Sequence, residues 1–204
     1  MKSLNHHEYV SIGSQSASRR IILLHGWGAN AYDLLPLGKE LIKDFNNDFE
    51  IIAIQAPNLS ANSNGREWYK LFPADWDQAS IAVDQLIYTL KGFGKDKIPL
   101  KKTVLLGFSQ GAAMSIDAGF KLDLGLIISC SGYSHPKWNP TSNCPVLISH
   151  GKNDNIVPFS SSQKIYQKLK SQLTAFCKMY EFDGEHEIDF NFIKVMQSKI
   201  NQFL

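Results

Sequence analysis

Short apolar runs alternate along this chain with longer segments in which apolar residues recur every three or four positions. The runs are rich in β-branched and aliphatic residues and are bounded by turn-forming residues, which is typical of strands. They cover residues 20–24, 50–55, 103–108, 125–129, 145–149 and 174–182. The segments with helical spacing lie at residues 32–45, 76–91, 110–121, 160–170 and 188–203. Residues 11–18, rich in Ser and Gly, predict a hairpin turn between short strands.

Strands that take turns with helices predict an α/β fold: a mostly parallel sheet of about seven strands with helices on both faces. The nearly continuous apolar character of TVLLGF and LIIS favours strands that are buried on both faces. At 204 residues without an internal linker, the chain is expected to form one domain over residues 1–204. Ligands of such sheets bind at the carboxyl ends of the strands, so the residues that follow each strand are the place to look for chemistry.

A serine lies at one of these strand ends, in the pattern Gly107-Phe108-Ser109-Gln110-Gly111. A buried strand precedes it and a helix with small residues follows it, which matches the strand–turn–helix elbow that carries the nucleophile of α/β-hydrolases. Glycines on both sides are needed there because side chains would collide with the neighbouring strand or helix. We therefore expect Ser109 to be a nucleophile.

A serine nucleophile needs an imidazole that takes its proton, and a carboxylate that orients the imidazole. In this fold the three residues follow one another in the order Ser, Asp or Glu, His. His186, in the loop before the last predicted helix, is the histidine that satisfies this order. Asp154 directly follows a predicted strand and is expected to be the acid. The other carboxylates after Ser109 fit less well, since they lie on the following helix, within a strand or beside His186 itself: Asp117, Asp123, Glu181, Asp183 and Glu185.

The negative oxygen of a tetrahedral intermediate needs N–H donors, and two backbone amides are candidates. One belongs to Gln110, at the start of the helix after the nucleophile, and the other to Trp27, in the loop HGWGAN. His25 and Gly26 in that loop are expected to shape the backbone rather than to react. Several aromatic residues near the same rim are candidates for lining an apolar substrate pocket: Tyr32, Trp68, Tyr69 and Phe72.

Composition narrows the partners and the compartment. The 21 basic and 19 acidic residues nearly cancel and form no basic block, which argues against nucleic acid as a partner. No apolar run approaches the ~20 residues that a membrane span needs, so stable membrane insertion is not expected. The N-terminus does not resemble a secretory signal. The cysteines, Cys130, Cys144 and Cys177, form no C-x-x-C clip and predict a reduced, cytoplasmic setting.

Five blocks of the chain resemble the phospholipase/carboxylesterase family of small α/β-hydrolases: LLHGWGANAYDLLPL, QAPN with REWY, LLGFSQGAAMS, LISHGKNDNIVP and the terminal GEHEI. The family includes acyl-protein thioesterases and bacterial carboxylesterases. The resemblance implies a hydrolase without a large lid, with Ser109, Asp154 and His186 as triad and the amides of Trp27 and Gln110 as oxyanion hole. It also implies ester or thioester substrates, and no cofactor or metal.

This chain departs from the family pattern at two positions. Relatives usually carry glycine directly before the catalytic histidine, whereas Glu185 stands between Gly184 and His186 here. A loop one residue longer is expected, and a carboxylate so near could raise the proton affinity of the base. Trp27 stands where relatives often carry Leu, which would narrow the acyl site.

The leading hypothesis is a serine hydrolase that cleaves a small ester or thioester, lipid-like ones included, and acts as a monomer or a homodimer. One alternative is an acyltransferase, in which an alcohol resolves the same acyl-enzyme. Another is a non-catalytic receptor that uses the pocket of the hydrolase fold, because a fold does not fix a function. A zinc hydrolase fits poorly, since neither HHE nor HEID matches H-E-x-x-H.

Overall fold

A computed structural model describes residues 1–14, 16–45, 48–60, 64–172 and 175–204. Its centre is an eight-stranded sheet in the spatial order β1-β2-β4-β3-β7-β8-β9-β10. The strands are β1 (Lys2–Leu4), β2 (His7–Gly13), β3 (Arg19–Leu24), β4 (Phe49–Ile54), β7 (Thr103–Phe108), β8 (Leu126–Cys130), β9 (Val146–Gly151) and β10 (Cys177–Phe182). β2 pairs antiparallel with both of its neighbours, β1 and β4, and the remaining neighbours pair in parallel. A small ribbon of β5 (Asn58–Leu59) and β6 (Arg66–Glu67) lies apart from this sheet.

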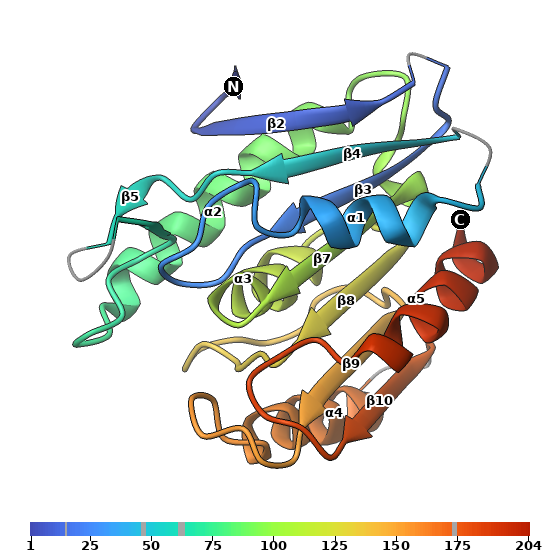
Figure 1. Cartoon of the computed structure of the whole chain (residues 1–204). Helices are drawn as coiled ribbons and strands as arrows, with labels where there is room; N and C mark the ends of the chain where they lie inside the picture. The colour runs from blue at the N-terminus through green and yellow to red at the C-terminus, as the bar shows by residue number, and fades with distance from the viewer. Residues whose placement is uncertain (15, 46–47, 61–63, 173–174) are drawn as a thin grey trace.

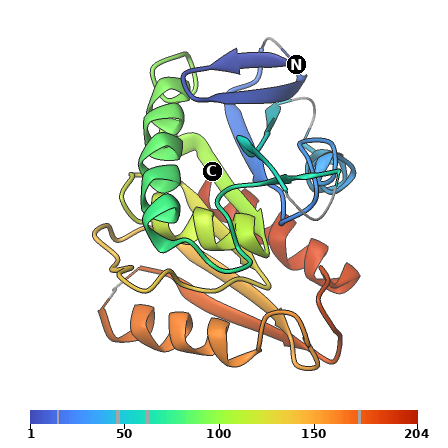
Figure 2. The same cartoon turned by 90° about the vertical axis from the view of Figure 1, so that its left-hand side faces the viewer.

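Helices cover both faces of the sheet. They are α1 (Leu35–Ile42), α2 (Trp76–Phe93), α3 (Gln110–Gly119), α4 (Ser160–Gln172) and α5 (Phe190–Phe203), with a short 3₁₀ helix η1 (Leu100–Lys102). Apolar residues of α2, α3 and α4 pack on one face, and those of α1 and α5 pack on the other. Figure 1 shows α1 and α5 in front of the sheet, and Figure 2 shows α2 and α4 on the opposite side. The α/β class, with a mostly parallel sheet between helices, is thereby confirmed.

The chain differs from the sequence-based prediction at three places. β2 and β3, which flank the turn predicted at residues 11–18, do not pair as a hairpin, because β4 lies between them in the sheet; residue 15 of that segment lies outside the described residues. The sheet has eight strands rather than about seven, since β1 and β2 add an antiparallel edge. α1 begins at Leu35 instead of residue 32, with a proline in its first turn, where proline's fixed φ is favourable. Thr174, where the last strand was expected to begin, lies outside the described residues.

The central strands are buried on both faces, which explains their continuous apolar sequence. Every residue of β8 and β9 is buried, and so is all of β7 except its last residue. Because β3, β7, β8 and β9 run in parallel, their carboxyl ends meet at one edge of the sheet. No helix among the described residues has the length and apolar character needed to cross a membrane.

Candidate active site

Ser109 occupies a strained turn between β7 and α3. Its backbone has φ 55° and ψ −117°, a conformation that non-glycine residues rarely adopt. A Cβ at Gly107 would lie 2.1 Å from the carbonyl oxygen of Gly111, and a Cβ at Gly111 would lie 2.1 Å from that of Leu24. The glycines on either side of Ser109 are therefore required by close backbone contacts, and the sharp turn holds the serine at the carboxyl edge of the sheet.

His186 links Ser109 to Asp154. Its Nε2 lies 2.9 Å from Ser109 Oγ, and its Nδ1 lies 2.7 Å from Asp154 Oδ2. A carboxylate oxygen accepts hydrogen bonds, so Nδ1 carries the proton and Nε2 is left with a lone pair that faces the serine hydroxyl. Three segments that are far apart in the chain, the turn after β7 and the loops after β9 and β10, thus meet in one hydrogen-bonded line.

Asp154 is buried, with its side chain fully covered and hydrogen bonds to both oxygens. Oδ1 accepts the backbone N–H groups of Ile156 and Val157 at 2.9 and 2.8 Å. Burial acts to raise the pKa of Asp154, but the hydrogen bond from His186 and these two N–H groups outweigh it and hold the pKa below its usual value. The carboxyl group is therefore ionised at neutral pH, as an orienting acid requires.

His150, the fifth residue of β9, lies directly against this carboxylate. Its ring is fully buried, and Nε2 faces both Val157 O at 2.8 Å and Asp154 Oδ2 at 3.1 Å. Burial lowers the pKa of His150, so the ring is neutral, and two acceptors at Nε2 place its proton there. Nδ1 then accepts from the Ser162 hydroxyl at 2.6 Å. His150 gives Asp154 a neutral donor. The order Ser, Asp, His along the chain excluded His150 as the base, but it did not predict the contact of His150 with Asp154.

The loop after β3 lies beside the elbow, and its backbone is fixed by local hydrogen bonds. His25 is buried; its Nδ1 donates to Gly26 O at 2.8 Å and its Nε2 accepts from Ala56 N at 3.1 Å. Burial lowers the pKa of His25, in keeping with a neutral ring. The backbone of β6 holds the same loop from outside, through Gly28 N to Arg66 O at 2.9 Å. These contacts agree with a structural rather than a chemical role for His25.

Gln110 follows the serine and is the first residue of α3, so its backbone N–H has no acceptor within the helix. The hydrogen bonds of its side chain were not predicted from the sequence. Oε1 accepts from Trp68 N at 3.0 Å and Nε2 donates to Tyr69 O at 2.8 Å. The buried amide thereby fastens the segment after β6 to the nucleophile elbow.

A cavity of about 560 Å³ opens above Ser109 and His186. Its lining is mostly apolar and comes from both sides of the site: Gly26, Trp27, Ala29, Asp33, Leu71, Phe72, Phe108, Tyr133, Ile156, Val157, Pro158 and Ser161. Trp27 contributes to one wall, where its indole N–H donates to Glu67 at 2.7 Å and its ring meets Phe72 edge to face. A concave, largely apolar site with a few polar groups at its floor is typical of small-molecule binding.

Of the four aromatic residues that were expected in the pocket, the structure places Phe72 along the cavity. Trp68 and Tyr69 are instead completely buried in the core, and Tyr32 is exposed outside the lining. The sequence analysis missed Ile156 and Val157, although they directly follow the candidate acid in the block HGKNDNIVP. The loop that carries Asp154 thus also supplies apolar wall.

The extra residue before His186 does not turn the imidazole away from the elbow. Glu185 is exposed, and its backbone N–H points to Glu187 Oε1 at 3.4 Å. Within the described ranges, no group of three or more His, Cys, Asp and Glu side chains is arranged to hold a metal ion.

Comparisons with known proteins show which family the chain belongs to. Residues 5–204 match the phospholipase/carboxylesterase family. Acyl-protein thioesterase 1 homolog 1 of Dictyostelium discoideum is 25% identical over 84% of either chain, and esterase YpfH of Escherichia coli is 24% identical over 81% of this chain and 74% of its own. Among solved structures, esterase PE8 superimposes with a TM-score of 0.85 at 26% identity, over 97% of this chain and 99% of its own. The carboxylesterase of Bacillus cereus shares the fold with a TM-score of 0.82 at 18% identity, over 97% and 95%. The chain has the α/β-hydrolase fold and belongs to the phospholipase/carboxylesterase family.

Proposed function

We propose that this protein hydrolyses carboxylic esters or thioesters through an acyl-enzyme on Ser109. The observation that carries the proposal is the line from Ser109 Oγ through His186 to Asp154 at the floor of an apolar cavity. His186 takes the serine proton as Oγ attacks the acyl carbon, and it returns that proton to the departing alcohol or thiol. A water molecule, activated by the same imidazole, then releases the acid and restores the serine.

The charge of the tetrahedral intermediate requires donors close to Ser109. We assign this role to the backbone N–H groups of Gln110 and Trp27, because Gln110 begins α3 and Trp27 lines the same cavity as the serine. The positive end of α3 adds to the stabilisation of a negative oxygen at that point.

The cavity favours a neutral, apolar acyl or alcohol group. Asp33 is the acidic side chain among its lining residues, so a substrate with a carboxylate on its chain would be repelled there. Small esters and thioesters, including lipid-like ones, fit this lining. The monomeric or homodimeric state and the cytoplasmic setting stay predictions; the three cysteines are free thiols.

The first experiment is labelling with a fluorophosphonate, together with turnover of p-nitrophenyl esters. We expect the wild type to be labelled and active, and Ser109→Ala to lose the label and at least ~10³-fold in kcat, since the nucleophile is absent. Ser161→Ala is the matched control, because Ser161 lines the same cavity but is not a member of the line from Ser109 through His186 to Asp154. An unlabelled wild type, or a label that persists in Ser109→Ala, contradicts the proposal.

Product analysis separates hydrolysis from the alternatives. With an excess of a competing alcohol, a hydrolase yields mainly the free acid, whereas an acyltransferase yields mainly a new ester. Tight binding of an ester that is never cleaved, and that is unchanged in Ser109→Ala, would identify a receptor instead.

A further inference from the structure

Residues 66–69, REWY, belong to one of the five blocks that resemble the family, yet the proposed reaction uses none of their side chains. The structure brings them into contact with both segments that carry the candidate oxyanion donors. One segment is the loop HGWGAN after β3, with the N–H of Trp27, and the other is the start of α3, with the N–H of Gln110. Residues 66–69 are therefore placed to influence the spacing of these two N–H groups.

The sheet alone does not set that spacing. β3 and β7 pair in parallel as far as Leu24 and Gly107, which form the last pair of the ladder. Trp27 and Gln110 each lie three residues beyond this pair along their own segments. The distance between their N–H groups therefore depends on contacts outside the sheet.

The side chain of Trp68 holds the loop after β3. Its indole N–H donates to His25 O at 2.9 Å, and its completely buried ring lies beside that of His25, with centroids 5.6 Å apart. His25 Nδ1 in turn donates to Gly26 O at 2.8 Å. Because a peptide unit is planar, the direction of the Gly26 carbonyl fixes that of the Trp27 N–H in the same unit. Trp68 and His25 thus hold two consecutive peptide units, and the second of them carries the N–H of Trp27.

The neighbours of Trp68 hold the same loop further along. The carboxylate of Glu67 accepts from the indole N–H of Trp27 at 2.7 Å. The backbone of Arg66 accepts from Gly28 N at 2.9 Å and donates to Ala29 O at 2.8 Å. Four consecutive residues of the loop are therefore held by one short segment, in addition to His25.

The backbone of Trp68 is bound to the other donor residue. Gln110 Oε1 accepts from Trp68 N at 3.0 Å, and Gln110 Nε2 donates to Tyr69 O at 2.8 Å. Gln110 is completely buried, so no water is at hand to replace a lost partner. Trp68 is thus connected through its backbone to the residue with one N–H, and through its indole to the loop with the other.

We propose that Trp68 is a positioning residue of the oxyanion hole, which holds the N–H groups of Trp27 and Gln110 at the spacing that the negative oxygen requires. Such donors act only when they point to the place where the negative charge develops, so a small displacement weakens the stabilisation of the transition state. Trp68 itself does not line the cavity above Ser109. The inference rests on the proposed function, because it needs a reaction in which an oxygen becomes negative beside Ser109.

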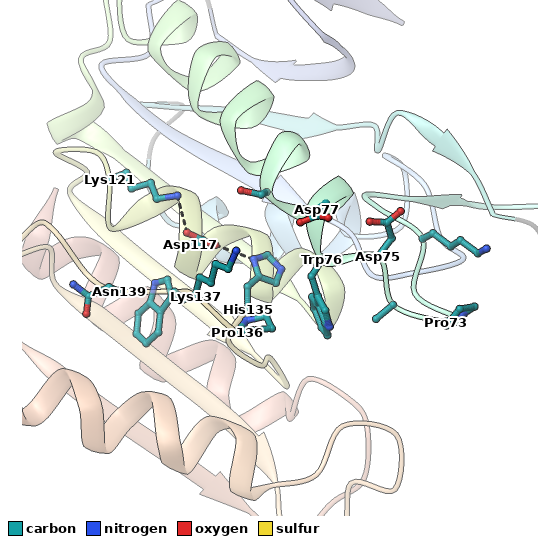
Figure 3. A pocket seen from close by; sticks show the side chains of 14 residues that line it. Pro73, Asp75, Trp76, Asp77, Asp117, Lys121, His135, Pro136, Lys137 and Asn139 are labelled. Atoms are coloured by element: carbon teal, nitrogen blue, oxygen red, sulfur yellow. Dashed lines mark hydrogen bonds and ion pairs between the residues drawn. The ribbon is translucent and has the colours of Figure 1, made fainter.

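Trp68→Phe tests the proposal, because it removes the indole N–H and keeps an aromatic ring in the core. Trp138→Phe is the matched control. Both indoles are buried in the same apolar cluster, but the N–H of Trp138 has no hydrogen-bond partner among the described residues. Trp138 lines a second cavity, of about 870 Å³, which Figure 3 shows around His135, and it does not line the cavity above Ser109.

We expect Trp68→Phe to lower kcat for p-nitrophenyl esters by about tenfold to a hundredfold, since the donors are displaced rather than removed. KM should change by less than about twofold, because the affected interaction is made only in the transition state. Trp138→Phe should keep both constants within about twofold of the wild type.

Binding of a trifluoromethyl ketone measures the same interaction without turnover. Ser109 Oγ bonds to the carbonyl carbon, the π pair of the C=O bond moves to the oxygen, which becomes negative, and the serine proton passes to His186. Trp68→Phe should weaken the binding of this ketone by the same factor as kcat. The binding of the corresponding alcohol, which cannot form the adduct, should not change.

Gln110→Met tests the contact on the other side, because a thioether keeps the length of the side chain but cannot bridge Trp68 N and Tyr69 O. It should lower kcat and the affinity for the ketone in the same way. The double variant should lose less than the product of the two single losses, since the two contacts act as a unit. Thermal unfolding would show whether each variant is folded, and Gln110→Met carries the test if Trp68→Phe is not.

Equal kcat and equal ketone affinity in Trp68→Phe and Trp138→Phe overturn the inference, whatever the stability of the two variants. A loss of affinity that is the same for the ketone and the alcohol also overturns it, because it indicates a purely structural role. A wild type that shows neither turnover nor the ketone adduct contradicts the proposed function itself. The two failures are therefore distinguishable.

Discussion

Asp154 determines which nitrogen of His186 carries the proton. Its carboxylate accepts from His186, from the backbone N–H groups of Ile156 and Val157, and from the neutral ring of His150. These donors fix the carboxylate in one orientation, and the carboxylate in turn fixes the imidazole. The ability of Nε2 to take the proton of Ser109 therefore depends on the orientation of the imidazole as well as on the charge of the carboxylate.

Asp154→Asn should lower kcat by about 10⁴-fold with little loss of stability. An amide at this position can donate to Nδ1, which favours the tautomer that carries its proton on Nε2, toward Ser109. Steady-state kinetics together with thermal unfolding would measure both effects. Asp183→Asn, in the exposed loop before His186, is the control and should keep its activity. A loss of less than tenfold in Asp154→Asn would argue that the carboxylate does not orient the base.

At the residue scale, the candidates Ser109, Asp154 and His186 could be selected from the sequence because their order and their positions after strands are local facts. The contact of the Gln110 side chain could not, since its partner Trp68 is brought near by the tertiary fold. The contact of His150 could not either, since Asp154, four positions later, reaches the ring only through the conformation of the loop after β9. The aromatic residues show the same limit. Trp68 and Phe72 lie four positions apart, yet one is buried in the core and the other lines the cavity.

At the scale of elements, strands and helices were predicted where the pattern is strong, and the antiparallel edge was not. β2 pairs with β4, whose residues come about forty positions later in the chain. The sequence of β2 alone does not predict this pairing. A polar contact fastens β2 to the helix that covers it. His7, the first residue of β2, is buried against α2, with Nδ1 donating to Thr89 Oγ1 at 2.9 Å.

Stability should fall in mild acid because of His7. Burial, with a smaller contribution from the charge of His6, lowers the pKa of His7 to about 4 in the folded protein. The unfolded chain takes up the proton near pH 6.5, whereas the folded protein does so only near pH 4. The free energy of unfolding is therefore highest above pH 6.5 and decreases as the pH falls toward 4. The expected loss of unfolding free energy is about 3 kcal/mol.

Urea unfolding at a series of pH values would measure this loss. In His7→Phe the slope between pH 6.5 and pH 4 should become shallower, because no buried imidazole remains to be protonated. His6→Phe should retain most of the slope, since burial is the larger cause. Equal slopes in the wild type and in His7→Phe would refute the assignment.

At the scale of the whole molecule, Arg20 joins parts of the chain that are distant in sequence. The guanidinium is fully buried, and it donates to Glu50, to Asp96 and to the carbonyl oxygens of Phe93 and Ile98. It thus connects β3 with β4 and with the turn after α2. The planar fork of arginine suits several acceptors at once, whereas an ammonium group is a point charge.

Arg20→Lys should therefore destabilise the fold by roughly 2–4 kcal/mol, because buried acceptors lose their donors. Arg19→Lys is the matched control. Arg19 is the adjacent residue and pairs with Asp48, whose side chain is 36% exposed, so its replacement should cost less than that of Arg20, about 1 kcal/mol. Urea midpoints with m-values would compare the two, and equal losses would show that Arg20 adds no more than a surface pair.

Each wall of the cavity above Ser109 is formed by a segment that also holds a residue of the candidate active site in position. The stretch that carries Phe72 follows β6, whose backbone secures the loop of Trp27, and Ile156 and Val157 hold Asp154 through their amides. These links run through the main chain, so they survive an exchange of side chains but not a change in loop length. Laboratory evolution toward new esters should therefore use single substitutions at positions such as 72 and 156. Replacement of whole loops would lower the turnover number as well as change the substrate selectivity.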